Sequence, residues 1–249
     1  MAGTLCLTVD NLGSALAVGR GREVKPDPDE PGLAVGLPRA LQLFDELGLD
    51  ATFFLEGWNG IHHPNAIEAI LAHGHEVALH GWVHERWATL TDDQREMLLW
   101  DGTAALRLAG ADPKGFRAPG GYRGTHTAAV LRELDYRYDS SIEQETEDDA
   151  LQVHTLDEGI TVVPWHWQGN DYWQYNMHPD GGQTPSQALY SWLSTLYRTA
   201  DTNGLMTLTV HPFVSFVEDA RFNAVSTLLR TALSIPNLLV LTAQKTAGG

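Results

Sequence analysis

The sequence predicts an α/β protein whose parallel strands form one sheet, either rolled into a barrel or left open. Three observations point to this class. Short apolar runs of strand length alternate with longer segments of helical period along most of the chain. The 249 residues suffice for one large domain with a sizeable core. Polar residues follow several of the apolar runs, where parallel α/β folds carry their active sites.

The first half of the chain sets up this alternation. Strands are expected at residues 5–11, 51–57 and 75–80, and a short strand and turn at residues 115–121. Helices are expected at residues 37–48, 65–74 and 91–110. Thr91 or Asp92 is a plausible N-cap of the third helix, while Gly48 and Gly74 close the first two. Residues 13–36 are rich in Gly, Pro and Asp and predict a long loop, which in a compact domain is often a functional lid.

The second half continues the pattern. Helices are expected at residues 126–136, 185–200 and 219–233, and strands at residues 160–167, 205–212 and 237–242. The acidic run at 143–149 is read as a solvated loop. No linker divides the chain, so we expect one domain over residues 1–249.

Charge and composition exclude several classes of partner. Acidic residues outnumber basic ones 32 to 16, a formal charge of −16, which argues against nucleic acid and against an anionic membrane surface. No apolar stretch approaches the roughly 18 residues of a membrane span. Cys6, the one cysteine, lies in an apolar run and is expected to be a small buried thiol. The chain starts without a basic and apolar leader, so a cytoplasmic protein is expected.

Two histidines four residues apart, His80 and His84, follow the predicted strand at 75–80. Such a pair alone is weak evidence and could be a helix start with two hydrogen-bonded side chains. If the two share a helix face, both rings can reach one ion. Neutral imidazole suits Zn²⁺, Co²⁺ or Ni²⁺, and a carboxylate or similar oxygen from another strand end would complete the site.

Five motifs together resemble one family. "LTVDN", "HGWVH", "FRAPGG", "NDYW" and "LTVHP" occur in the order and spacing of the NodB-homology polysaccharide deacetylases, carbohydrate esterase family 4. The resemblance extends from about Leu5 to Thr242. It implies a distorted (β/α)7 barrel and metal-assisted hydrolysis of an N-acyl group.

The resemblance assigns a base and a metal site. Asp10 would be the general base, and Asn11, His80 and His84 would hold a divalent metal, with zinc expected and cobalt or nickel as alternatives. Asn11 departs from the family, which has an acid there. Either the metal is held more loosely, or Asp10 becomes a ligand, or the site works without metal. From its neighbours alone, Asn11 could equally be a turn residue.

Four further residues take roles from the later motifs. Arg117 would orient Asp10 through charge-assisted hydrogen bonds. Gly120, where most relatives carry tyrosine, would supply a backbone N–H to the oxyanion hole. Asp171 matches the acid that supports the arginine. His211 would give a proton to the leaving amine.

An aromatic-rich run, "PWHWQGNDYWQY", suggests a substrate platform, although a core strand followed by a loop would look similar. Flat apolar faces with a polar rim suit sugar rings or planar heterocycles. We expect Trp165, Trp167, Trp173 and Tyr122 to bind substrate.

Three functions remain open. The first is deacetylation of an N-acetylated amino sugar, either a small molecule or an oligosaccharide. The second is hydrolysis of a cyclic amide such as a ureide or imide, without a metal in one version. The third is a catalytically silent carbohydrate-binding module. A homo-oligomer in which a partner subunit completes the pocket is compatible with all three.

Overall fold

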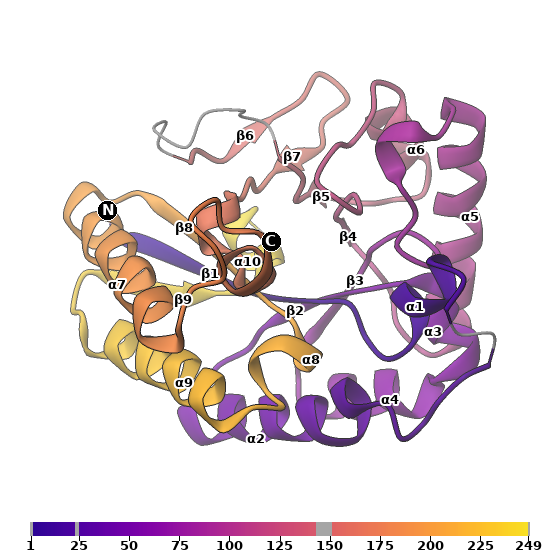
Figure 1. Ribbon diagram of the computed structural model, residues 1–249. Coiled ribbons are helices and arrows are strands. Elements are labelled where there is room, and N and C mark those ends of the chain that lie inside the picture. The colour runs from indigo at the N-terminus through magenta and orange to yellow at the C-terminus, as the bar shows by residue number, and fades with distance from the viewer. Residues whose placement is uncertain (1, 23–24, 143–150, 249) are drawn as a thin grey trace.

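A computed structural model describes residues 2–22, 25–142 and 151–248, and its centre is a curled sheet surrounded by helices (Figure 1). The strands are β1 (Gly3–Asp10), β2 (Thr52–Leu55), β3 (Glu76–Leu79), β4 (Gly115–Phe116), β5 (Tyr138–Asp139), β6 (His154–Thr155), β7 (Thr161–Val162), β8 (Leu205–Val210) and β9 (Leu238–Leu241). Their hydrogen-bonded order is β6-β7-β5-β4-β3-β2-β1-β8, and β9 pairs with β1. Of these pairs only β6–β7 is antiparallel.

The sheet curls until its two ends nearly meet. The segment that follows β7 reaches β8 through one parallel bridge, between Asn170 and Thr209. A second, antiparallel bridge joins Leu151, before β6, to Leu205 of β8. Within the described ranges the curl contains seven parallel strands, β1 to β5, β7 and β8, and these isolated bridges connect its ends. The predicted fold class, a distorted (β/α)7 barrel, is confirmed.

Helices cover the outside of this curl. They are α1 (Ala15–Gly19), η1 (Gly32–Gly36), α2 (Leu37–Leu47), α3 (Gly57–His62), α4 (Pro64–Ala72), η2 (Trp87–Thr89), α5 (Asp92–Leu108), α6 (Thr127–Glu133), η3 (Trp167–Gly169), η4 (Trp173–Met177), α7 (Pro185–Thr202), α8 (Pro212–Ser215), α9 (Asp219–Ser234) and α10 (Ala243–Thr246). In Figure 1, α2, α4 and α9 lie along the lower edge, α5 on the right and α7 on the left. None of the described helices is long and apolar enough to cross a membrane.

The longer predicted helices are present, and their ends follow the expected signals. Thr91 caps α5: its hydroxyl accepts from the backbone of Gln94, whose side chain bonds back to the Thr91 backbone. Gly48 ends α2 with φ of 63°, a conformation that glycine adopts without steric cost. The acidic run at 143–149 lies outside the described residues.

Two predicted segments differ from the structure. The 13–36 stretch was expected to be a loop, but it contains α1 and the π-helical turn η1. The strand expected at 160–167 is only Thr161–Val162. Pro164 has no backbone N–H to donate, so the ladder cannot continue through it.

Alternation along the strands separates the two faces of the barrel wall. Leu5, Leu7 and Val9 of β1 pack into the main core. Cys6 faces the other way, where it belongs to a small apolar cluster inside the barrel and, as predicted, is a buried thiol. Thr8 lies on the same side as Cys6, nearer the carboxyl end of β1. The inside of the barrel therefore changes from apolar to polar toward the carboxyl ends of the strands, where parallel α/β folds carry their functional side chains.

Candidate active site

Polar residues from several strand ends meet in one cavity of about 130 Å³. The predicted site residues that line it are Asp10, Asn11, His80, His84, Gly120, Trp165, Trp167 and His211. These residues lie at or after the carboxyl ends of β1, β3, β4, β7 and β8, which all belong to the one sheet. The shared edge of a parallel sheet therefore assembles the site from distant parts of the chain.

Arg117 lies inside the barrel, against Asp10. Its side chain is fully buried, and Nη1 donates to Asp10 Oδ1 at 2.7 Å and to the Thr8 hydroxyl at 2.9 Å. Nε and Nη2 donate to the carbonyl and the hydroxyl of Ser140 at 3.0 and 2.8 Å. The guanidinium also sits 4.1 Å from the ring centroid of Phe54. So many fixed contacts hold the Asp10 carboxylate in one orientation.

His80 and His84 approach each other from a turn, not from a helix as expected. Their ring centroids are 5.0 Å apart. Gly81 and His84 both have positive φ, 71° and 59°, which reverses the chain within four residues. The prediction that the two histidines share a helix face is therefore wrong, although the turn still brings both rings to the cavity.

The hydrogen bonding of His80 defines which of its nitrogens is available. Nδ1 lies 2.8 Å from the backbone oxygen of Arg117, so Nδ1 carries the proton that it donates there. Nε2 then has a free lone pair, and it lies 4.0 Å from Asp10 Oδ2. Burial lowers the pKa of His80 to about 3, and burial, followed by the neighbouring His80, lowers that of His84 to about 3. Both rings are neutral near pH 7 and suited to metal coordination.

Asn11 presents a buried amide oxygen to the same cavity. The residue is 3% exposed with φ of 61°, and its Oδ1 has no hydrogen-bond partner among the described residues. An unpaired buried oxygen is costly, so a ligand in the cavity would stabilise this arrangement. Two neutral imidazoles and an amide oxygen fit a divalent cation such as zinc, but they bring no negative charge to it. The described residues contain no cluster of three His, Cys, Asp or Glu side chains arranged to hold a metal.

Asp171 supports His211, which corrects the expectation that it supports Arg117. Asp171 Oδ1 lies 2.5 Å from His211 Nδ1, and Oδ2 accepts from the His211 backbone at 2.8 Å. The Ser215 hydroxyl also donates to Oδ2, at 2.5 Å. Burial alone would lower the pKa of His211, but the charge and hydrogen bond of Asp171 outweigh burial and raise it. This pairing keeps a proton on the imidazole.

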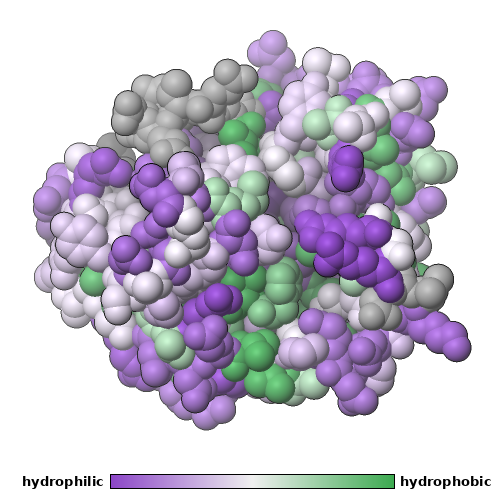
Figure 2. Space-filling view, in the orientation of Figure 1, coloured by the Kyte–Doolittle hydropathy of each residue, from purple (hydrophilic) through white to green (hydrophobic). Residues whose placement is uncertain are grey.

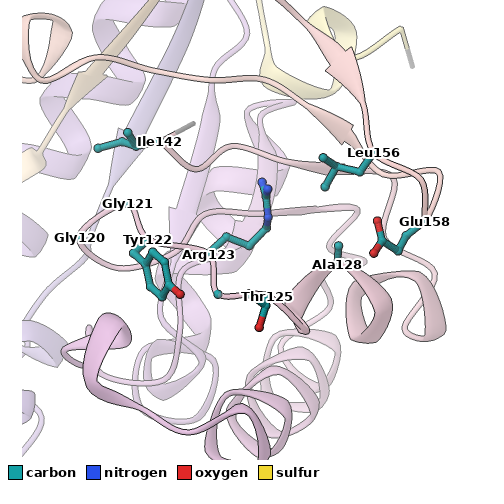
Figure 3. Close-up of a pocket in the computed structure, with 10 residues that line it drawn as sticks. Gly120, Gly121, Tyr122, Arg123, Thr125, Ala128, Ile142, Leu156 and Glu158 are labelled. Carbon is teal, nitrogen blue, oxygen red and sulfur yellow. The ribbon is translucent and has the colours of Figure 1, made fainter. Parts of the chain in front are cut away.

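Two of the four expected aromatic residues line the cavity. The rings of Trp165 and Trp167 meet edge to face, 4.9 Å apart. Trp173 is not among the residues that line this cavity, and its ring packs on His178 at 4.7 Å. Tyr122 lines a second hollow, of about 550 Å³, together with Gly120 (Figure 3). Trp173 and Tyr122 therefore do not line this cavity, and their expected contact with the substrate stays a prediction.

Sequence reasoning missed several residues around the site. Tyr172, next to the expected Trp173, lines the cavity, and so do Leu16 and Arg20 on and beside α1. Glu56, at the end of β2, is fully buried, and burial raises its pKa to about 8. Its carboxyl accepts from the backbone of Leu12, which holds the segment that follows β1. The acid at the end of the strand "TFFL" was a signal that could have identified Glu56.

Part of this chain matches one family model and several curated proteins. Residues 29–138 match the family model described as polysaccharide deacetylase. The chain is 33% identical over 126 residues to the peptidoglycan deacetylase of Helicobacter pylori, covering 49% of this chain and 43% of that protein. It spans less than half the length of the first curated relatives that it matches.

Solved structures extend the likeness to nearly the whole chain. A putative polysaccharide deacetylase from Mycobacterium smegmatis superposes with a TM-score of 0.86 at 28% identity, covering 98% of this chain and 88% of that one. The structure described as Puue allantoinase superposes with a TM-score of 0.81 at 19% identity, covering 99% and 90%. The second likeness shows the fold alone.

Proposed function

We propose that this chain is a hydrolase of the polysaccharide deacetylase family that removes an acetyl or similar acyl group from a nitrogen atom. The observation that carries the proposal is that two residues lining one cavity, Asp10 and His211, each form a buried pair with an oppositely charged group. Asp10 is held by Arg117, and His211 is held by Asp171. One group is placed to accept a proton and the other to donate one.

The two groups divide the proton transfers of amide hydrolysis. Asp10 takes a proton from a water molecule while the oxygen of that water attacks the amide carbon. The Gly120 N–H, which has no acceptor among the described residues, is available to the oxyanion of the tetrahedral intermediate. When the C–N bond breaks, His211 gives its proton to the nitrogen. The products are a carboxylic acid and a free amine.

A divalent metal is part of this proposal. Asn11, His80 and His84 would hold it, and when bound it would polarise the substrate carbonyl and lower the pKa of water. Family deacetylases generally depend on a metal. The neutral donor set implies weaker binding than a set with a carboxylate. Removal of metal by a chelator is expected to lower turnover, and restoring zinc, cobalt or nickel to return it.

An N-acetylated amino sugar is the substrate class that we propose. Family relatives include proteins described as peptidoglycan and chitin deacetylases. The faces of Trp165, Trp167 and Tyr172 at the cavity suit a sugar ring, whose axial faces are apolar and whose rim is polar.

A cyclic amide is the second candidate substrate, and Asn11 favours it. Where the family's acidic metal ligand is replaced by an amide, a reaction without metal becomes a reasonable alternative. A catalytically silent binding module is the third candidate. The pairing of Asp10 with Arg117, and of His211 with Asp171, favours a hydrolase over such a module.

One screen separates these candidates. N-acetylated amino sugars and cyclic ureides or imides are incubated with purified protein, with and without chelator. Released acetate is measured for the sugars, and the ring-opened product for the cyclic amides. Acetate release that chelation abolishes supports the metal-dependent deacetylase. Ring opening that survives chelation supports the cyclic-amide hydrolase and contradicts the metal assignment. If neither class reacts with or without added metal, the hydrolase proposal is wrong.

A further inference from the structure

A third hollow, of about 730 Å³ and distinct from the one lined by Tyr122, adjoins the active-site cavity and carries three arginines. Arg20, Arg22 and Arg86 line it, and none of their guanidinium groups forms an ion pair or side-chain hydrogen bond with another described residue. Unpaired arginines are unexpected in a chain with a formal charge of −16, where carboxylates are abundant. Figure 2 shows strongly hydrophilic side chains gathered over α1, beside a hollow in the surface. The three cations are thus available to a ligand.

The hollow is continuous with the catalytic cavity. Arg20, His84 and Gly120 line both. A substrate whose amide lies at Gly120 and His84 can therefore extend past Arg20 without leaving the protein surface. The arginines are placed to contact a part of the substrate that does not react.

The segment that carries two of these arginines is docked firmly on the active site. A Cβ at Gly19 would overlap with the backbone oxygen of Val83, so α1 packs directly on the turn that ends in His84. Backbone hydrogen bonds from Arg22 to Ala17, at 2.8 Å, and from Gly21 to Val18, also at 2.8 Å, close the chain after α1. This geometry keeps the backbone at Arg20 and Arg22 beside the histidine.

The acidic residue in the hollow is already engaged. Glu85 lines it too, but its carboxylate accepts from the backbone N–H groups of Trp82 and Val83 at 3.1 and 2.9 Å. These bonds tie the carboxylate to its own turn, and neither oxygen forms an ion pair with an arginine of the hollow. The three guanidinium charges outnumber this single carboxylate.

We propose that this hollow, the arginine subsite, binds an anionic oxygen group of the substrate, a carboxylate or a phosphate. The guanidinium fork matches both groups through paired charge-assisted hydrogen bonds. The subsite also offsets the repulsion that a strongly acidic protein exerts on an anion. The inference rests on the proposed function and narrows its substrate to an anionic N-acyl compound.

The test compares three N-acetylated sugars that differ in charge. They are N-acetylglucosamine, its 6-phosphate, and N-acetylmuramic acid, which carries a carboxylate. The protein variants are the double substitution Arg22→Gln with Arg86→Gln, and Arg198→Gln as a matched control. Arg198 is an exposed arginine on α7 that also lacks an ion pair with any described residue, and it does not line the hollow.

The expected result is a loss confined to charged substrates. For the wild-type protein, kcat/KM is expected to be at least tenfold higher for one or both anionic sugars than for the neutral one. The double variant should lose about tenfold on the preferred anion, equivalent to about 1.4 kcal/mol, and less than twofold on N-acetylglucosamine. The Arg198→Gln variant should behave as wild type. Which anion is preferred distinguishes the phosphate from the carboxylate. Equal kcat/KM for all three sugars, or an equal loss on all three in the double variant, would overturn the subsite while leaving the hydrolase intact.

A binding measurement keeps the two proposals distinguishable if no sugar is turned over. Inorganic phosphate and acetate are titrated into each protein and followed by nuclear magnetic resonance of the ligand. Binding of either ion that the double variant loses and Arg198→Gln retains supports the subsite even if the hydrolase proposal fails. Binding that is absent, or unchanged in the double variant, contradicts the subsite.

Discussion

Asp171 holds His211 from two sides: one carboxylate oxygen lies 2.5 Å from the ring Nδ1, and the other accepts from the His211 backbone at 2.8 Å. The two residues come from segments 40 positions apart, brought together where the chain after β7 bridges to β8. With Nδ1 occupied by Asp171, the other ring nitrogen remains for the reaction. The bridge between Asn170 and Thr209 therefore brings together the two residues that form the proposed general acid.

The first prediction concerns the substitution Asp171→Asn. Asp171 raises the pKa of His211, so an amide at this position should lower that pKa. Because the protonated imidazole is the proposed acid, activity falls as pH rises through its pKa, and this decline should move to lower pH in the variant. A loss of about 100-fold in kcat near pH 7 is expected, within the usual range for general acid catalysis.

The control for this prediction is Ser215→Ala. It removes the third hydrogen bond to Asp171 but leaves the carboxylate charge. Its pH profile should shift by much less than that of Asp171→Asn. Identical pH profiles for wild type and Asp171→Asn would mean that His211 is not the acid.

A second prediction concerns the metal and Asn11→Asp. The amide oxygen of Asn11 is buried without a partner, and a carboxylate at the same place would add a negative charge beside the two histidines. The variant should bind zinc at least about tenfold more tightly, measured by competition with a chelator. Asn11→Ala, which removes the oxygen, should bind more weakly than wild type. Equal zinc affinity in all three proteins would show that this residue does not contact the ion.

A third prediction is a loss of stability in acid that depends on His80. Its pKa in the folded protein is about 3, whereas an unfolded histidine titrates near 6.5. Between pH 6.5 and 3, His80 binds a proton in the unfolded chain but stays neutral in the folded protein. The contribution of His80 to stability is therefore lost as pH falls from 6.5 toward 3. The slope is about 1.4 kcal/mol per pH unit for one proton.

The measurement is denaturant unfolding of wild type and His80→Asn across this pH range. Asparagine can still donate to the Arg117 carbonyl but does not titrate. The variant should show a shallower dependence of the free energy of unfolding on pH. Curves that stay parallel between pH 6.5 and 4 would be inconsistent with a neutral buried His80.

A fourth prediction concerns the docking of α1 through Gly19→Ala. The added methyl group would collide with the Val83 backbone, so α1 must move away from the turn that carries His84. We expect a higher KM with a circular-dichroism spectrum close to wild type. Gly21→Ala is a useful comparison, since its Cβ would meet open space although φ is 67°. If KM for Gly19→Ala matches that for Gly21→Ala, the packing of α1 does not shape the site.

The fold could be predicted well because the long helices and the buried strand β1 each have a clear pattern of apolar residues in their own sequence. Short strands do not: β4, β5 and β7 are two residues each, and their pairing is decided by neighbours far along the chain. The strand end that carries Asp10 was predictable from an apolar run followed by polar residues. The partner of Asp171 was not, because Arg117 and His211 are both distant basic residues and only the three-dimensional register chooses between them.

The histidine turn illustrates the same limit. Spacing alone favoured a helix for His80 and His84, yet positive φ at Gly81 and at His84 makes a turn. For a non-glycine residue such as His84, tertiary contacts overrode the local preference. The position of α1 over the cavity could not be predicted from the sequence either, since it depends on close packing between Gly19 and Val83.

The most direct test of the account is the turnover of an N-acetylated substrate by Asp10→Asn. Released acetate is measured for wild type and variant at equal metal loading, with unfolding curves to establish that both are folded. Loss of the carboxylate that Arg117 holds at 2.7 Å should lower kcat by about 100-fold or more. A folded Asp10→Asn protein that releases acetate as fast as wild type would contradict the assignment of Asp10 as the base.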